Sequence, residues 1–277
     1  MLSFCPNELD TQLSAREQMI KCIEDVRKFL EDNKLSNNGD KTEFIIIGSA
    51  NKLKKVEINS VEVAGVTIKA VDHARNLGII FDNKMSMDHQ VKKVCKTGYF
   101  HIRNIASIRN CLNKKDTKTI THAFVTSTLD YGNSLLYGIS GKNLNKLQVL
   151  QNSAARVIEK KSKYDHITET LKELHWLPVV ARIKFKILTY VWKSLNEMAP
   201  PYLKNMLALT ERRRDLRNEN LVILDEPRTN RKTMGDIAFA KAGPFLWNQL
   251  PVEIRTAKSL SIFVSKLKTH LFIQYYV

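Results

Sequence analysis

The chain has 277 residues, of which 43% are hydrophobic and 26% charged, and these values are typical of folded globular proteins. A chain of this length can bury a substantial core, as one large domain or two smaller ones. The composition therefore excludes a wholly disordered protein. The net charge of +16 favours a polyanionic partner, although a basic surface that only confers solubility would give the same charge.

The charge is unevenly distributed along the chain. Residues 1–40 contain five Lys or Arg and eight Asp or Glu, a balance of −3. The remaining residues contain 39 basic and 20 acidic side chains, a balance of +19. The basic character therefore belongs to the chain beyond residue 40.

Cysteine usage and hydropathy predict an intracellular protein, in the cytoplasm or nucleus, with reduced thiols. The four cysteines form no C-x-x-C pair, which argues against a zinc knuckle or a secreted disulfide framework. No basic segment followed by an apolar one marks a signal peptide. The longest apolar runs, such as residues 44–47, are far shorter than a membrane span of about 20 residues. We therefore expect no secretion and no membrane partner.

The N-terminal third predicts a helix lying on a small antiparallel sheet. The capping box Ser14-Ala15-Arg16-Glu17 marks the expected start of the helix, and apolar residues from Met19 to Leu30 recur at helical spacing. Residues 41–48 predict a buried strand. Shorter strands are expected at residues 56–58, 62–63 and 66–68.

Residues 74–94 predict a strand through Asn76-Leu77-Gly78, a tight turn, and then the start of a long basic helix. Leu77, Ile79, Ile80 and Phe81 suit a buried strand, and Asp82-Asn83 suits a turn.

The helix predicted from Met87 has two distinct sides. One side is apolar and consists of Val91, Val94, Cys95, Gly98, Ile102 and Ile105. The other side consists of Lys92, Lys93, Lys96 and Arg103. An exposed charged face is often merely solvated, but this one carries four bases and no acid. The single sign of charge favours a stripe that contacts phosphates.

Further helices are predicted at residues 113–128, at residues 142–160, from Pro178, and at the C-terminal end. The second of these ends in a basic cluster of Arg156, Lys160 and Lys161. Such a cluster suits phosphate binding, but it also complements the helix dipole. Residues 209–236 are polar and rich in arginine, and they predict a loop or linker.

The sequence contains no recognisable catalytic or metal-binding constellation. The patterns G-x-S-x-G and H-E-x-x-H and a Walker loop are missing. His89, Cys95 and His101 are six residues apart, which places them on different faces of a helix. The residues alone therefore predict no enzyme, no catalytic residue and no metal site.

Several motifs occur in a characteristic order along nearly the whole chain. They lie at residues 33–35 with 40–44, 76–78, 129–133, 147–156, 174–179 with 182–184, and 246–251 with 254–255. This series resembles the jockey-like and chicken-repeat-like branch of LINE-type (non-LTR) retrotransposon reverse transcriptases. Each motif alone is weakly specific, and the specificity lies in their order.

The resemblance implies an α+β fold that is mostly α. It implies a palm remnant at residues 1–85, with a helix on a small antiparallel sheet, and thumb-like helices at 86–137. A C-terminal helical region at 138–208, the basic loop at 209–236 and a helical tail at 237–277 would follow.

The resemblance also implies roles for individual residues. Lys41 matches a late-palm lysine that approaches the incoming triphosphate, and Leu77 and Gly78 match the turn of the primer grip. Without the resemblance, Lys41 would be interpreted as a solvated base beside a strand, and Gly78 as a residue that simply allows a turn. The basic helix would hold the phosphates of a template–primer duplex without reading its sequence. The implied partner is RNA, DNA or an RNA–DNA hybrid.

The chain departs from the family at its catalytic centre. In the family, two Mg²⁺ ions held mainly by palm aspartates carry the chemistry. The family's Ala-Asp-Asp turn precedes the segment that Leu2-Ser3-Phe4 resembles, and Asp10, Asp25 and Asp32 cannot replace it because they lie outside the matching motifs. The chain alone is therefore expected to be inactive and to need no cofactor. Two alternatives remain: a structural remnant without specific binding, and the C-terminal half of a polymerase completed by further N-terminal sequence.

We predict that the purified 277-residue chain incorporates no nucleotide on a primed RNA template with Mg²⁺ or Mn²⁺, because the metal-binding aspartates are missing. Extension of a labelled primer measures this, with an active reverse transcriptase on the same template as the control. Detectable extension by the chain would contradict the prediction.

Overall fold

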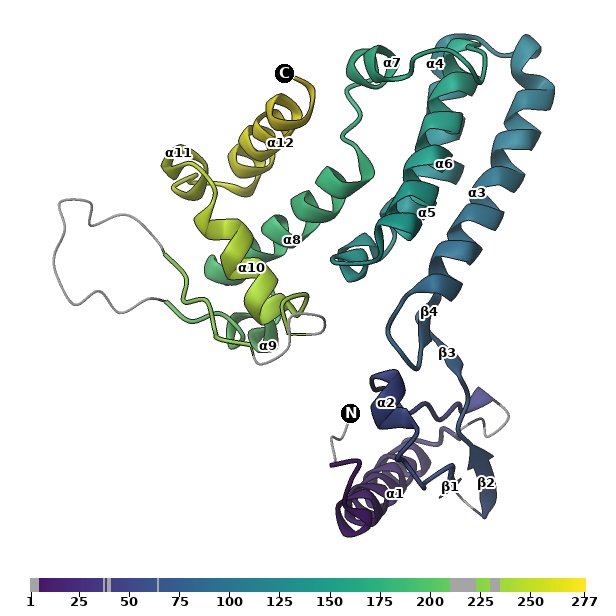
Figure 1. Cartoon of the computed structure of the whole chain (residues 1–277), viewed down its shortest axis with the longest axis vertical. Helices are drawn as coiled ribbons and strands as arrows, with labels where there is room; N and C mark the ends of the chain where they lie inside the picture. The colour runs from purple at the N-terminus through teal and green to yellow at the C-terminus, as the bar shows by residue number, and fades with distance from the viewer. Residues whose placement is uncertain (1–4, 37, 39–40, 64, 210–222, 230–234) are drawn as a thin grey trace, which may run out of the picture. The chain divides into compact units, whose positions relative to one another are not determined.

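A computed structural model describes residues 5–36, 38, 41–63, 65–209, 223–229 and 235–277. It divides into two compact units, Met1–Lys93 and Val94–Val277, and helix α3 (Asp88–Ile108) belongs to both (Figure 1). The described chain is mostly helical with two small antiparallel sheets. This confirms the α+β, mostly α class that the sequence predicts. Most of the predicted loop at 209–236 lies outside the described residues, as does Asp40.

The described residues of the first unit form one long helix, a single-turn helix, two hairpins and the beginning of α3. Its elements are α1 (Leu9–Asp32), α2 (Ala50–Leu53), β1 (Ser60–Val63), β2 (Val66–Lys69), β3 (His73–Asn76) and β4 (Ile79–Asp82). Strands β1 and β2 pair with Ser60 opposite Lys69, and β3 and β4 pair with His73 opposite Asp82. Met19 and Ile23 of α1 pack on a core that includes the buried Val61. The predicted packing of a helix on a small antiparallel sheet is thus confirmed for β1 and β2, whereas β3 and β4 form a second, separate two-stranded sheet.

The predicted start of α1 is wrong, because the helix begins at Leu9 and Ser14 lies inside it. Gln12 is buried, its Nε2 donates to the carbonyl oxygen of Lys55, and its Oε1 accepts the N–H of Glu57. These contacts, more than 40 residues away in the chain, stabilise the additional turn. The apolar stripe of α1 is also only partly buried, since Val26 and Phe29 are 52% and 65% exposed.

The predicted strands at 41–48 and 56–58 are also wrong. Phe44 makes one parallel bridge with Ala70, in which the N–H of Val71 donates to the Phe44 carbonyl oxygen at 2.8 Å. The N–H of Gly48 donates to the carbonyl oxygen of Asn83 instead of entering a ladder. The apolar residues at 44–47 therefore do not form a regular strand, although Phe44 is buried as such a strand would require.

Among its described residues, the second unit consists of helices with their connections and one isolated antiparallel bridge between Leu209 and Leu224. Its elements after α3 are η2 (Arg109–Cys111), α4 (Lys114–Thr121), η3 (His122–Thr126), α5 (Ser127–Asp130), η4 (Asn133–Leu136), α6 (Gly141–Glu159), α7 (Thr168–Glu173), α8 (Val179–Leu195), α9 (Pro201–Lys204), α10 (Phe239–Asn248), α11 (Val252–Arg255) and α12 (Leu260–Tyr276). The predicted helices at 113–128, 142–160, after Pro178 and at the C-terminal end are confirmed. Asn113 caps α4 as expected, because its Oδ1 accepts the N–H of Asp116 at 2.8 Å.

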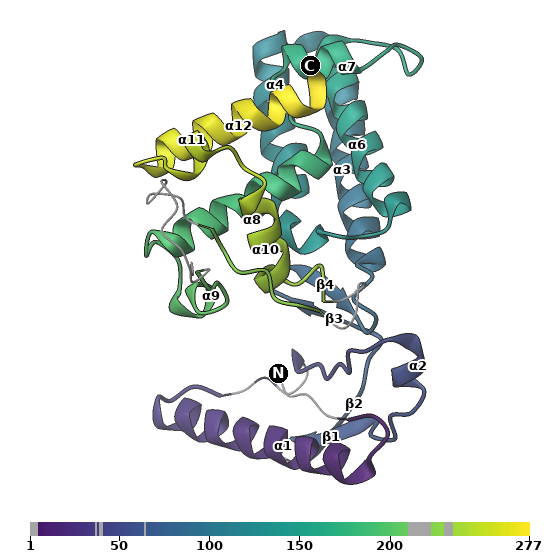
Figure 2. The same ribbon diagram turned by 60° about the vertical axis from the view of Figure 1, so that its left-hand side comes forward.

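The core of the C-terminal helices forms around α8, which packs against α10 and α12 (Figure 2). The ring of Phe263 lies 5.6 Å from that of Trp192 and 6.0 Å from that of Trp247, measured between centroids. All three side chains are almost completely buried, so these aromatic residues belong to the core and do not stack on a ligand. None of the described helices is long and apolar enough to cross a membrane.

Candidate nucleic-acid interface

The hairpin β3–β4 turns at Leu77 and Gly78, between the paired Asn76 and Ile79. Both turn residues have positive φ, 46° for Leu77 and 84° for Gly78. A two-residue turn with this pair of angles matches the right-handed twist of the strands, but it costs a non-glycine residue about 1–2 kcal/mol. Leu77 is 84% exposed. The interpretation of Leu77 as a buried strand residue is therefore wrong, because the hairpin register places it in the turn.

Three side chains connect this hairpin to the start of α3. Lys93 Nζ donates to the carbonyl oxygen of Gly78 at 2.5 Å, and Gln90 Oε1 accepts the N–H of Ile80 at 3.0 Å. The buried carboxylate of Asp82 accepts backbone N–H groups from the segment that leads into α3, at 2.9 Å from Ser86 and 2.7 Å from Met87. The hairpin and the first turn of α3 are thus held as one piece.

Lys93 consequently differs from its neighbours in the predicted stripe. Its ammonium contacts the backbone of Gly78, and the side chain is partly buried. Burial, followed by the nearby charge of Arg75, lowers the pKa of Lys93 below its ordinary value. The structure therefore gives Lys93 a role in fixing the hairpin.

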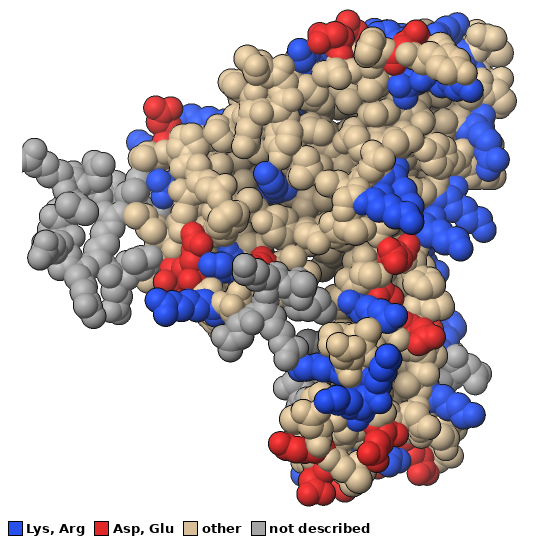
Figure 3. All heavy atoms as spheres, viewed as in Figure 1, with Lys and Arg blue, Asp and Glu red and all other residues tan. Residues whose placement is uncertain are grey.

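The remaining bases of α3 lie on its solvent side. Val91, Val94, Gly98, Ile102 and Ile105 are buried, as the helical period predicts. Lys92, Lys96 and Arg103 are exposed, and we call these three residues the α3 basic face. Lys and Arg side chains lie along α3 in Figure 3. None of the six ion pairs among the described residues includes a member of the α3 basic face.

Helix α6 adds a base that the sequence analysis missed. A Cβ atom on Gly98 would lie 2.7 Å from Leu150 Cδ2, so glycine permits the close approach of α3 and α6. The exposed Lys146 of α6 lies near Cys95 of α3, where its charge partly opposes the rise in thiol pKa that burial causes. Helical periodicity within α3 cannot reveal a base on another helix. The sequence signal for a basic surface on α6 is that residues 131–158 contain no Asp or Glu.

The basic cluster at the end of α6 has partners within the chain. Arg156 donates from Nε and Nη2 to the carbonyl oxygens of Ser162 and Asp165, at 3.1 and 3.2 Å. Lys160 Nζ lies 3.3 Å from Asn110 Oδ1, and Lys161 Nζ lies 2.7 Å from Thr170 Oγ1. These contacts hold the segment that follows α6, which favours the structural explanation of the cluster over phosphate binding.

Lys41 lies apart from the bases of α3 in the chain. It is exposed, and its backbone N–H donates to the carbonyl oxygen of Asn38 at 3.2 Å. Among the described residues its side chain makes no hydrogen bond or ion pair. The structure thus leaves its predicted role without a supporting contact.

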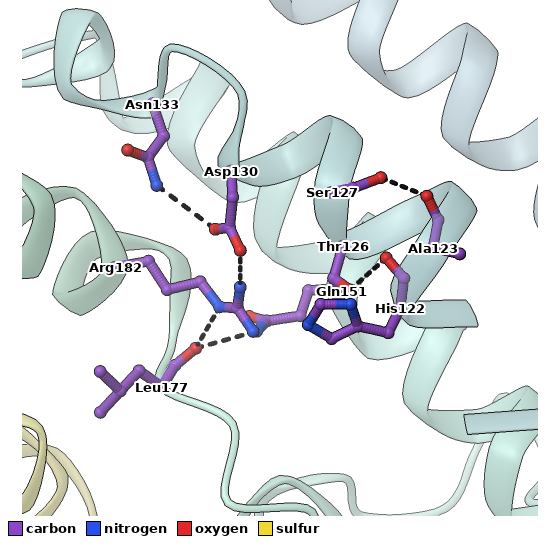
Figure 4. A network of polar contacts seen from close by, with 9 residues as sticks. All are labelled: His122, Ala123, Thr126, Ser127, Asp130, Asn133, Gln151, Leu177 and Arg182. Carbon is purple, nitrogen blue, oxygen red and sulfur yellow. Dashed lines mark hydrogen bonds and ion pairs between the residues drawn. The ribbon is translucent and has the colours of Figure 1, made fainter. Parts of the chain in front are cut away.

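Three of the family-like motifs meet in one polar network (Figure 4). Arg182 forms an ion pair with Asp130 at 2.5 Å, and its Nε donates to the carbonyl oxygen of Leu177 at 3.1 Å. Gln151 Nε2 donates to the same carbonyl at 2.8 Å, and Asn133 Nδ2 donates to Asp130 Oδ1. The network joins α5, α6 and α8, so these motifs supply structural contacts. Within the described residues, no cluster of three His, Cys, Asp or Glu is suited to a metal ion.

No family model matches the chain, and no curated protein or solved structure matches it either.

We predict that Asp82→Asn loosens the connection between the hairpin and α3, because it removes the negative charge that accepts two short N–H bonds. The loss should be about 1–3 kcal/mol of local stability. Hydrogen exchange of the Ser86 and Met87 amides, measured by NMR or mass spectrometry, should accelerate accordingly.

Asp72→Asn is the matched control, because Asp72 Oδ1 accepts one exposed side-chain hydrogen bond from Asn83. Its effect on the same amides should be small. Equal acceleration in both variants would contradict the anchoring role of Asp82.

Proposed function

We propose that the chain is the C-terminal part of a LINE-type reverse transcriptase, with a palm remnant, a thumb and a C-terminal helical region. In this proposal it binds RNA, DNA or their hybrid without reading sequence. The observation that carries the proposal is the α3 basic face, which is exposed and makes no ion pair among the described residues. The order of the motifs supports the family assignment.

The charge around α3 supports a polyanionic partner over a merely solvated surface. Residues 89–115 contain seven Lys or Arg and no Asp or Glu. Lys114, near the end of this range, is paired with Glu159 at 2.8 Å, whereas Lys92, Lys96 and Arg103 make no ion pair among the described residues. A surface on which bases greatly outnumber acids repels other basic proteins and attracts phosphates.

The dimensions of the α3 basic face also fit a nucleic-acid backbone. Lys92 and Arg103 are separated by eleven helical positions, or about 16 Å along the axis. A duplex carries one negative charge per roughly 1.7 Å, so about ten phosphate charges would lie alongside this length. Contacts of this kind position a duplex and depend strongly on salt, but they do not distinguish bases.

The proposal assigns binding, and no catalytic step, to this chain. A second candidate is the C-terminal half of an active polymerase that further N-terminal sequence completes, either in a longer chain or in a second chain. The exposed apolar side chains of Val26 and Phe29 on α1 support it, because such a stripe suits a surface that further protein covers. In the intact family enzyme, Mg²⁺ would serve as the cofactor.

We predict that Lys92→Glu combined with Lys96→Glu weakens binding to an RNA–DNA hybrid by at least about tenfold and reduces the salt slope by about 2. Both side chains face away from the buried side of α3, so the fold should persist. Fluorescence anisotropy at several salt concentrations measures affinity and slope, and circular dichroism checks the fold.

The control is Lys258→Glu with Lys268→Glu, which makes the same change in net charge at exposed positions of the C-terminal region. Its affinity should fall far less. An equal loss in both double variants would show that net charge, and not the α3 basic face, determines binding.

A further inference from the structure

Three aromatic rings gather on α3 and η3, on the second unit. The Phe100 and His101 ring centroids are 5.3 Å apart at 73°, and His101 and Phe124 are 5.1 Å apart and stacked at 27°. Phe100 and Phe124 are nevertheless 53% and 50% exposed. We call these three residues the aromatic cluster. It is not part of the core, and the proposed phosphate contacts do not use it.

The segment that carries Phe124 has an unusual backbone. Element η3 is π-helical, and the N–H of Ser127 donates to the carbonyl oxygen of His122, five residues earlier. Single π-helical turns are rare and are frequently found at functional sites. Phe124, whose ring lies beside that of His101, belongs to this π-helical turn.

Successive hydroxyl groups donate to the backbone carbonyls of this segment. Thr126 Oγ1 donates to the His122 carbonyl oxygen at 2.9 Å, and Ser127 Oγ donates to that of Ala123 (Figure 4). Thr128 Oγ1 donates to the carbonyl oxygen of Phe124 at 2.9 Å. These side chains supply donors to carbonyls in the widened turn. The backbone that carries Phe124 is thus held by several hydrogen bonds from hydroxyl side chains.

Two residues of the α3 basic face, Lys96 and Arg103, flank Phe100 along the helix. Lys96 precedes Phe100 by four residues and Arg103 follows it by three, so all three project from nearly the same side of the helix. A nucleic-acid backbone held by Lys96 and Arg103 would therefore pass beside Phe100. Bases of a duplex interior stack on one another, whereas unpaired bases have free faces that stack on aromatic side chains.

We propose that the aromatic cluster is a stacking platform for the bases of a single-stranded nucleic-acid segment, such as an unpaired extension of a duplex. This inference rests on the proposed function, because the α3 basic face must hold the phosphates of that segment. A protein partner with an apolar surface is disfavoured, because Lys96 and Arg103 would be desolvated beside it without a counter-charge. A nucleic acid supplies the aromatic faces and the negative charge together.

The test compares two fluorescent probes, a blunt-ended RNA–DNA hybrid and the same hybrid with a single-stranded extension. The wild-type chain should bind the extended probe more tightly. Phe100→Leu with Phe124→Leu removes the aromatic faces and keeps apolar side chains, so it should lose about tenfold in affinity for the extended probe. Its affinity for the blunt probe and its salt slope should stay nearly unchanged, because no phosphate contact is lost.

Two further variants separate stacking from structure. Phe245→Leu changes a phenylalanine on α10 that is 43% exposed, and it should leave both affinities unchanged. Phe100→Trp should retain the preference for the extended probe. Its indole fluorescence should be quenched by that probe more strongly than by the blunt one, whereas the three native tryptophans are buried.

Equal binding of both probes by the wild-type chain would overturn the stacking platform and leave phosphate binding by α3 intact. Retention of the preference by the double leucine variant would also overturn it. Failure of the folded chain to bind either probe would overturn the platform together with the proposed function.

Discussion

The packing of α3 is the constraint on which the candidate interface depends. Its apolar residues recur with the helical period and are buried, and Gly98 allows Leu150 of α6 to approach closely. Charged groups are costly to bury without partners, so the bases between these positions must face solvent. The same packing that stabilises the helix therefore creates the α3 basic face. The hydrogen bonds of Asp82 and Gln90 then fix where this helix begins.

The motifs that resemble a reverse transcriptase contribute mainly to structure in this chain. Arg182 and Gln151 both donate to the Leu177 carbonyl oxygen, and Arg182 also pairs with Asp130. Asn248 holds the backbone of Leu224 through N–H and C=O contacts at 3.0 and 2.9 Å. Such contacts require particular side chains at particular positions. A motif can therefore be characteristic of a family for structural reasons, without taking part in catalysis. The proposed binding uses exposed residues that lie mostly outside these motifs.

Much of the helical architecture could be predicted from the sequence, because it depends on local signals. The two sides of α3 follow from periodicity, and the start of α4 follows from the cap at Asn113. Features that depend on distant contacts were not predictable in this way. The first turns of α1 depend on Gln12, whose partners are near residue 55, and the contribution of Lys146 requires the packing of α6 on α3. The aromatic cluster includes Phe124 of the π-helical turn and joins it to α3, and no simple sequence period indicates either feature.

The most direct test of the central claim is the salt dependence of binding between the wild-type chain and a fluorescent RNA–DNA hybrid. Contacts from Lys92, Lys96 and Arg103 to three phosphates predict that the logarithm of the affinity falls linearly with the logarithm of salt concentration, with a slope of about −2.7 or steeper. Binding that does not change with salt, or the absence of binding by a chain shown to be folded, would contradict the claim that α3 is a phosphate-binding helix.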